Sequence, residues 1–164
     1  MTGGDGSEGV DYRQRFIEDV EPGEELPRVV DLVTYRRVIM NPATTWDYFP
    51  GHHDPEYARA QGQPTIYVNT MFVLGFVDRC VIEWSGPRSF LARRKVSTRR
   101  SVYAGDTVVG TGRVVATRHE EREGLVRHLV ELELEVTNQH GDQCVSALAT
   151  VALPSRADGG RPHR

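Results

Sequence analysis

The chain has little cysteine, no long apolar run and little net charge. Its 164 residues include two cysteines, Cys80 and Cys144, which lie far apart and form no CxxC pair. A disulfide framework or a structural zinc site is therefore not indicated, and we expect two buried thiols in a reducing compartment. No apolar run approaches the roughly 20 residues that a membrane-spanning helix needs. The first residues carry no signal-peptide pattern, so the expected location is the cytoplasm, away from membranes.

The formal net charge of −3 argues against general nucleic-acid binding. Hydrophobic residues make up 38% of the chain and charged residues 26%, which is an ordinary mixture for one globular domain. The segments 1–10 and 155–164 are Gly-rich and polar, and they bury too little surface to offset the entropy of ordering them. We therefore expect a single folded domain at residues 11–154 between two flexible tails.

One segment predicts a long and unusually apolar helix. It spans residues 69–87, NTMFVLGFVDRCVIEWSGP. Asn69 suits the N-cap of this helix, and Gly86 followed by Pro87 suits its end. Because the helix is apolar on most sides, it has to be covered on most sides by the rest of the domain.

Four segments after this helix have the patterns of strands. Residues 130–136, VELELEV, alternate between apolar and acidic side chains, as a half-buried antiparallel strand does. The sequence TYRRVIM at 34–40 predicts a further short strand, and GTG at 110–112 predicts a bulge or bend inside a strand. The other predicted strands are 92–102, 106–119 and 143–153. The economical arrangement is α+β, with a curved antiparallel sheet wrapped around the central helix, and it resembles the hotdog fold.

A short helix is predicted at residues 54–62, DPEYARAQG, where Asp54 is the N-cap and Gly62 ends the helix. This role accounts for Asp54 structurally. A metal site formed by His52, His53 and Asp54 is not favoured, because adjacent histidines rarely point at one ion and no distant Cys or His pair completes a ligand set.

Asp47 and His52 have no such structural explanation. They lie five residues apart with a Pro-Gly pair between them. Their side chains would diverge on a regular helix, but they converge across a turn. A carboxylate beside an imidazole suits general acid–base catalysis, because imidazole exchanges a proton near neutral pH. The alternative is that Asp47 caps a turn and His52 is a hydrogen-bonded surface residue.

The stretch WDYFPGHHDPEYARAQG resembles the hydratase motif of the MaoC-like enoyl-CoA hydratases and dehydratases, in which an Asp is followed five residues later by a His. The resemblance continues through IYVNTMFVLGFVDRCVIEWSGP and YAGDTVVGTGRVV, and it covers roughly residues 34–153. The HHD run and the Asn at the helix entrance are similar to the small subunits of actinobacterial steroid side-chain hydratases.

This resemblance implies that Asp47 and His52 are the catalytic pair. They would add water to a trans-2-enoyl thioester or remove it from an (R)-3-hydroxyacyl thioester. No metal or other cofactor is implied, and the acyl group is expected on coenzyme A or an acyl carrier protein. The resemblance also implies a backbone N–H at the start of the central helix that binds the enolate oxygen. Thr70 stands at that position, where a Gly is frequent.

Two further positions depart from the pattern of the family. Asn69 stands where a His is common, and Phe49 replaces a frequent Asn. We expect these changes to alter the shape of the site more than its proton chemistry. The residues expected to bind the oxyanion and the substrate are Thr70, Asn69, Phe49, Tyr67 and His53.

Cations gather in RSFLARRKVSTRR at 88–100. Arg93 and Arg94 are predicted to bind the phosphates of coenzyme A or an acidic carrier protein. The alternative is a solvated strand face that resists edge pairing. Because a single hotdog unit leaves a sheet edge exposed, we expect a homodimer or a heterodimer with a related hotdog chain.

Two other functions stay open from the sequence. A hotdog thioesterase would use a carboxylate on or near the central helix, where Asp78 and Glu83 are available, and a shared fold does not fix the reaction. A repurposed or non-catalytic partner subunit is the other possibility, which the changes at Phe49, Asn69 and Thr70 favour. The intact pair of Asp and His counts against it.

Overall fold

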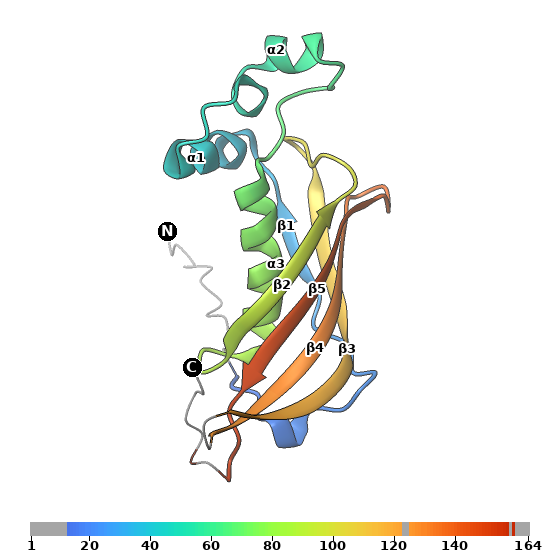
Figure 1. The fold of residues 1–164 in the computed structure, drawn as a ribbon. Helices are drawn as coiled ribbons and strands as arrows, with labels where there is room; N and C mark the ends of the chain where they lie inside the picture. The colour runs from blue at the N-terminus through green and yellow to red at the C-terminus, as the bar shows by residue number, and fades with distance from the viewer. Residues whose placement is uncertain (1–12, 123–124, 158, 160–164) are drawn as a thin grey trace, which may run out of the picture.

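The computed structural model describes residues 13–122, 125–157 and 159. Figure 1 shows a long helix packed against a curved sheet, with two shorter helices beyond one end of the sheet. The helices are α1 (Tyr35–Thr45), α2 (Pro55–Ala60) and α3 (Thr70–Ser85). Short 3₁₀ turns span Ile17–Asp19 (η1) and Pro50–His52 (η2). The strands are β1 (Val29–Leu32), β2 (Phe90–Thr98), β3 (Thr107–Arg122), β4 (Leu125–Thr137) and β5 (Gln143–Leu153).

The sheet has the order β1-β3-β4-β5-β2, and each pair of neighbours is antiparallel. The alternating side chains of β4 divide between its two faces as predicted. The glutamates lie half-exposed on the outer face, and the buried positions are Val130, Leu132, Leu134 and Val136. The sheet curves around α3 (Figure 1). The expected α+β hotdog architecture is confirmed.

The central helix has the predicted ends. The Asn69 side chain accepts a hydrogen bond from the Phe72 N–H, and Gly86 ends the helix with a φ of 89°. The buried side chains of α3 are mostly apolar, and they include Val77, Val81 and Trp84. Burial of this kind of surface is the main stabilising contribution to a fold of this size.

The glycines at 110–112 serve close packing and not a bulge. A Cβ at Gly110 would lie 2.4 Å from the Sγ atom of Cys80 on α3. The pairing register of β3 and β4 runs unbroken through this stretch, and the irregularity lies between Val114 and Ala116. The predicted bulge or bend was therefore wrong in position. Gly110 is needed where α3 approaches the sheet, and Gly112 is needed where the Glu133 carbonyl and Leu26 lie close to β3.

The segment from Thr34 to Met40 is part of a helix and not the predicted strand. Thr34 caps α1 by accepting a hydrogen bond from the Arg37 N–H, and the helix continues through Pro42. Val38 and Pro42 are its buried residues, four positions apart. The β-branched side chains suggested a strand, but burial of this one helical face outweighs their weak local preference.

The segment from α1 to α2 projects beyond the sheet. Figure 1 places it past the end at which α3 begins, so that its turns lie over the N-terminus of α3. The short helix α2 has the predicted cap, because the Asp54 side chain accepts hydrogen bonds from the N–H groups of Glu56 and Tyr57. This projecting segment carries the titratable residues of the sequence motif.

The end of the domain extends further than the sequence suggested. Ser155 is buried and donates a hydrogen bond to Glu18, while Arg156 forms an ion pair with Asp19. These two residues were assigned to the flexible tail, and that assignment is wrong for them because η1 binds both. The predicted N-terminal tail at 1–10 and residues 158 and 160–164 lie outside the described residues.

Both cysteines are free and buried, as expected from their apolar surroundings. Burial raises the pKa of Cys80 to about 12, so this thiol stays protonated at neutral pH. Among the described residues, no helix is both long and apolar enough to span a membrane. Within the same residues, no group of three or more potential metal ligands is found.

Candidate active site

Asp47 follows α1 directly and is held by the end of that helix. The helix ends at Thr45, and its C-cap, Trp46, has a left-handed backbone with a φ of 58°. This conformation is rare for a bulky residue and costs about 1–3 kcal/mol. The Asp47 N–H donates to the carbonyl of Pro42 at 3.0 Å, and its Oδ1 accepts from the Phe49 N–H at 3.4 Å. The carboxylate is thereby placed at the start of the turn that carries His52.

His52 lies at the end of η2, whose centre has no room for a side chain. A Cβ at Gly51 would lie 2.7 Å from the Tyr67 hydroxyl and 2.7 Å from the Phe49 ring. The Nδ1 atom of His52 lies 2.8 Å from the carbonyl oxygen of Tyr67. Because a carbonyl can only accept, Nδ1 carries the proton of the neutral ring, and Nε2 has a free lone pair.

The two side chains meet as the motif predicts. The Nε2 atom of His52 lies 3.5 Å from Oδ2 of Asp47. The His52 side chain is 9% exposed and that of Asp47 is 38% exposed, so the pair opens to solvent on the side of the carboxylate. The separation is long for a direct hydrogen bond, and both atoms can reach one bridging water. The surface-residue alternative for His52 is wrong, because this ring is buried.

Asn69 connects the pair to α3. Its Oδ1 accepts from the Phe72 N–H at 3.0 Å, which fixes the orientation of the amide. The Nδ2 atom donates to Oδ2 of Asp47 at 3.2 Å and to Oγ1 of Thr45 at 2.9 Å. Asn69 was predicted to contact substrate, and the structure places its amide on the carboxylate. Thr45 escaped the sequence analysis because its bond to Asn69 spans 24 residues and leaves no local pattern.

Aromatic rings surround the imidazole. The centroids of Phe49 and Tyr67 lie 5.5 Å and 5.2 Å from the His52 centroid, both in edge-on contact. Tyr57 packs against Phe49, and Tyr103 packs against Tyr67. Burial raises the pKa of Tyr67, so this hydroxyl stays neutral at physiological pH. With these ring contacts, the His52 side chain is only 9% exposed.

Asp47 and His52 thus lie in a turn over the first residues of the central helix. Comparison with known families tests whether this arrangement belongs to one of them. The family model of the MaoC like domain matches residues 19–136, which is well over half of the chain. The chain belongs to the MaoC-like domain family. The match includes the pair, α3 and most of the sheet.

Among proteins of known function, this MaoC-like chain is similar to the beta subunit of the 3-oxo-4,17-pregnadiene-20-carboxyl-CoA hydratase of Mycobacterium tuberculosis. The two are 36% identical over 81 residues, which is 48% of this chain and 61% of that subunit. The aligned region therefore spans less than two thirds of that relative.

Solved structures extend the likeness over more of the fold. The ChsH1-ChsH2 complex from Mycobacterium tuberculosis superposes with a TM-score of 0.70 and 27% identity, over 80% of this chain and 97% of that chain. The (R)-hydratase from A. caviae involved in PHA biosynthesis superposes with a TM-score of 0.73 over 84% of this chain and 99% of that chain. At 23% identity, the second likeness shows the fold alone.

Thr70 lies at the first position of α3, next to the pair. The first N–H groups of a helix have no partners within the helix. The N–H of Phe72 donates to the side chain of Asn69, and the N–H of Val73 donates to the backbone carbonyl of Asn69. Within the described part of the chain, the N–H groups of Thr70 and Met71 have no such acceptor.

The remaining predicted residues lie elsewhere. His53 is exposed, and its Nε2 lies 3.4 Å from the carbonyl of Tyr48, on the outside of the turn. Arg94 forms an ion pair with Asp78 on α3. Arg93 precedes Arg94 on β2, so its side chain points to the face of the sheet opposite to that of Arg94. The structure does not bring these three residues together with the pair.

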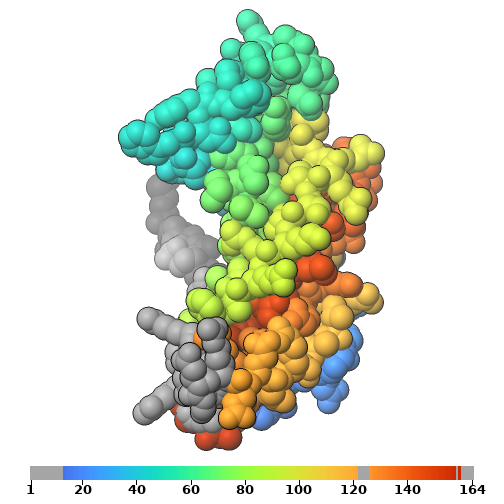
Figure 2. Space-filling view, viewed as in Figure 1, coloured from blue at the N-terminus to red at the C-terminus, as the bar shows by residue number. Residues whose placement is uncertain are grey.

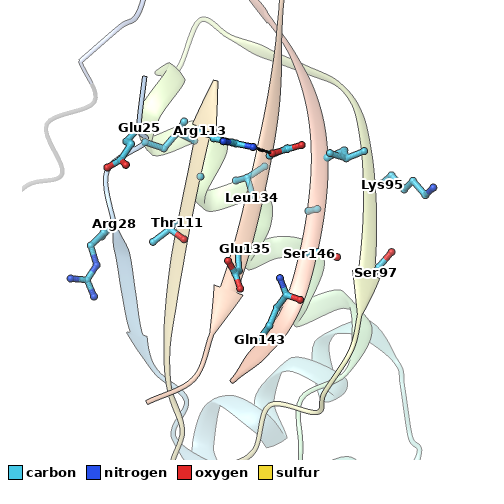
Figure 3. Close-up of a pocket in the computed structure, with 15 residues that line it drawn as sticks. Glu25, Arg28, Lys95, Ser97, Thr111, Arg113, Leu134, Glu135, Gln143 and Ser146 are labelled. Atoms are coloured by element: carbon cyan, nitrogen blue, oxygen red, sulfur yellow. Dashed lines mark hydrogen bonds and ion pairs between the residues drawn. The ribbon is translucent and has the colours of Figure 1, made fainter. Parts of the chain in front are cut away.

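Two cavities lie apart from the acid–base pair. A groove of about 610 Å³ runs over the outer face of the sheet (Figure 3) and is lined by residues that include Lys95, Arg113 and Glu133. Neither Asp47 nor His52 lines it, and it has no imidazole. A smaller apolar gap lies between the first turns of α3 and the sheet, lined by Phe72, Val73, Phe76, Val102, Val108, Val136 and Val145. The larger groove has carboxylates, which include Glu133 and Glu135, but no imidazole stands beside them as His52 stands beside Asp47.

Proposed function

We propose that this MaoC-like chain is a hydratase or dehydratase of acyl thioesters. The observation that carries the proposal is the 3.5 Å approach of His52 Nε2 to Asp47 Oδ2, with Nδ1 of the same ring committed to the Tyr67 carbonyl. Two acceptors thus face one water position, between the buried His52 ring and the solvent-exposed side of Asp47.

The reaction follows from the hydrogen-bonding capacity of this pair. A water that donates to both His52 Nε2 and Asp47 Oδ2 presents an oxygen lone pair to the β-carbon of a trans-2-enoyl thioester. As the C–O bond forms, one proton of the water passes to the pair, and a proton returns from the pair to the α-carbon. In the reverse direction, the pair removes the α-proton and protonates the leaving hydroxyl. The chemistry needs no change of oxidation state.

The developing enolate needs hydrogen-bond donors on its thioester oxygen. The N–H groups of Thr70 and Met71 at the start of α3 can supply them, and the helix dipole favours negative charge there. A backbone N–H is available from Thr as well as from Gly. The Thr70 side chain narrows the approach, so it affects which acyl groups enter.

The proposed substrate class is a coenzyme A thioester. The support is the relative in Mycobacterium tuberculosis, which is named for a steroid carboxyl-CoA. The phosphate contacts predicted for Arg93 and Arg94 stay a prediction. Because Arg94 is already paired with Asp78, Arg93→Ala is the more informative change. A rise in KM with unchanged kcat would support a phosphate contact, and an unchanged KM would reject it.

We also propose that the working unit contains a second hotdog chain. The solved relative at 27% identity is a complex of two chains, ChsH1 and ChsH2. In addition, strand β2 forms one edge of the sheet, and β5 is its one paired neighbour among the described strands. A partner chain would cover that edge.

The thioesterase alternative is less well supported. It needs a free carboxylate on or near α3, but Asp78 is paired with Arg94 and Glu83 with Arg79. The non-catalytic alternative has to explain why Asp47 and His52 are held together by Asn69 and by the Tyr67 carbonyl.

Two substrates separate these functions. The purified chain would be given a trans-2-enoyl-CoA and, separately, the saturated acyl-CoA of the same length. A hydratase lowers the enoyl absorbance without releasing thiol. Release of thiol from the saturated compound would identify a thioesterase, and that result would overturn the proposal.

A further inference from the structure

Two histidines lie side by side at the end of the sheet that is remote from the acid–base pair. His119 on β3 and His128 on β4 occupy directly opposite positions of the antiparallel ladder. Figure 1 places this end of β3 and β4 at the other end of the sheet from α1 and α2, and in Figure 2 it reaches the surface of the molecule. His119 is exposed and His128 is half-exposed, so small ions in solution have access to the two rings.

The two rings face each other through the same kind of nitrogen. Nδ1 of His119 lies 2.8 Å from Nδ1 of His128. The ring centroids are 4.9 Å apart, and the rings are nearly perpendicular, at 86°. In this contact one Nδ1 donates its proton and the other accepts with its lone pair. At least one of the two rings is therefore neutral, with its Nδ1 lone pair directed at the other ring.

The separation of the two Nδ1 atoms matches that of adjacent ligands on one metal ion. Zn–N bonds of about 2.0–2.1 Å, at an angle of about 90–110°, place two ligand nitrogens about 2.8–3.4 Å apart. Directly opposite residues on paired strands have their Cβ atoms about 4.5–5.5 Å apart, so the backbone keeps the rings close together. When an ion binds, the donating ring carries its proton on Nε2 instead, and both Nδ1 lone pairs then face the ion.

The carboxylates near the two histidines are engaged elsewhere. Arg118 forms ion pairs with Glu120 and with Glu131. Arg118 and Glu120 flank His119 on β3, so their side chains point to the other face of the sheet. Within the described residues, no group of three or more potential ligands is found. The two imidazoles are thus the protein ligands of this site, and water fills the other positions around an ion.

This ligand set determines which ions bind. Imidazole nitrogen suits Zn²⁺, Ni²⁺ and Cu²⁺, whereas Mg²⁺ and Ca²⁺ prefer oxygen ligands. The affinity of a nitrogen site for divalent ions rises along the first transition row to Cu²⁺ and falls again at Zn²⁺. A site with two imidazoles should follow the same order.

We infer that His119 and His128 form a surface site for a divalent transition-metal ion, which binds Cu²⁺ more tightly than Zn²⁺ and does not bind Mg²⁺. The ion joins β3 to β4. Because the two ligands come together only in the folded chain, binding stabilises the folded state. This inference goes beyond the proposed hydration and does not depend on it, since the site and the acid–base pair lie at opposite ends of the sheet.

Titration calorimetry with Zn²⁺ tests this site on the full-length chain without a polyhistidine tag. We expect one ion per chain in the tightest binding step. His119→Ala and His128→Ala should each weaken this step at least about tenfold. The double variant should bind no more weakly than the single variants, because loss of either ring already breaks the chelate. In thermal unfolding, Zn²⁺ should raise the Tm of the wild type and leave that of each variant unchanged.

The matched control is His140→Ala, which removes an exposed imidazole between β4 and β5 and should bind Zn²⁺ like the wild type. Titration with Mg²⁺ should give no binding, and circular dichroism would establish that each variant is folded. Wild-type affinity for Zn²⁺ in either folded variant of the pair would overturn the inference. A wild-type chain that does not bind Zn²⁺ would overturn it as well, because the two rings would then only join the strands through their hydrogen bond.

Discussion

At the scale of single residues, the site depends on which atoms are already occupied. The backbone carbonyl of Tyr67 accepts from Nδ1 of His52, which leaves Nε2 available for the proposed reaction. Asn69 uses its amide oxygen as a helix cap and both of its N–H bonds as anchors. A Ser at position 69 can reproduce only the cap, and an Ala can reproduce neither the cap nor the anchors. Asn69 is therefore a positioning residue that acts through Asp47.

Two substitutions separate the cap from the anchor. Asn69→Ala should lower the free energy of unfolding by about 1 kcal/mol through loss of the cap, and it should also lower kcat. Asn69→Ser keeps a capping oxygen, so it should recover most of the stability while kcat stays low and KM changes little. Thermal unfolding and steady-state kinetics measure the two effects. A serine variant with restored kcat would show that the anchor on Asp47 is dispensable.

At the scale of elements, the sequence predicted what periodicity and caps control. The ends of α3, the Asp54 cap and the alternation of β4 follow from local chemistry, and the structure confirms them. Helix α1 was not predicted, because its formation depends on the burial of Val38 and Pro42 against other elements. The contacts of Asp47 with Asn69, and of Asn69 with Thr45, join residues more than twenty positions apart. No local pattern predicts such pairs.

The approach of α3 to β3 gives a prediction at this scale. Gly110→Ala places a methyl group against Cys80 and Phe76, so overpacking should destabilise the chain by about 1–3 kcal/mol. Gly75→Ala is the matched control, because it faces open space on α3 and should stabilise the isolated chain by about 0.5–1 kcal/mol. Chemical denaturation measures both. Equal effects of the two changes would contradict the packing described for Gly110.

At the scale of the whole molecule, the two ends of the domain are joined beneath the sheet. Glu18 accepts hydrogen bonds from Ser155 and from the Arg156 N–H. The hydrogen bond from Ser155 is the main cause that lowers the pKa of Glu18 below its usual value of 4.5, against a smaller opposing effect of burial. The ionised carboxylate thus favours the folded state. This contribution is present above the unfolded pKa and is lost as pH falls below it.

Glu18→Gln removes this contribution and gives a test. At neutral pH the variant should melt at a lower temperature than the wild type, and the difference should shrink as the pH is lowered below about 4.5. Glu21→Gln, an exposed carboxylate on the same segment, is the control. A melting difference that stays constant from pH 7 to pH 3 would mean that Glu18 does not join the two ends through its charge.

Two features of the overall arrangement underlie the two proposals on the working unit. The projecting α1–α2 segment brings Asp47 and His52 over the start of α3, and β2 leaves one edge of the sheet for a partner. The hydratase proposal requires the first feature, and the proposed two-chain unit requires the second.

The most direct test of the central claim is the rate of hydration of a trans-2-enoyl-CoA by Asp47→Asn, followed as loss of enoyl absorbance. His53→Ala is the matched control, because this residue follows His52 in the sequence but its ring is exposed and faces the Tyr48 carbonyl. We predict that Asp47→Asn, like His52→Ala, lowers kcat by at least about a hundredfold, the usual scale for loss of a positioned acid–base group, while His53→Ala stays close to the wild type. Wild-type rates in folded Asp47→Asn protein would contradict the account.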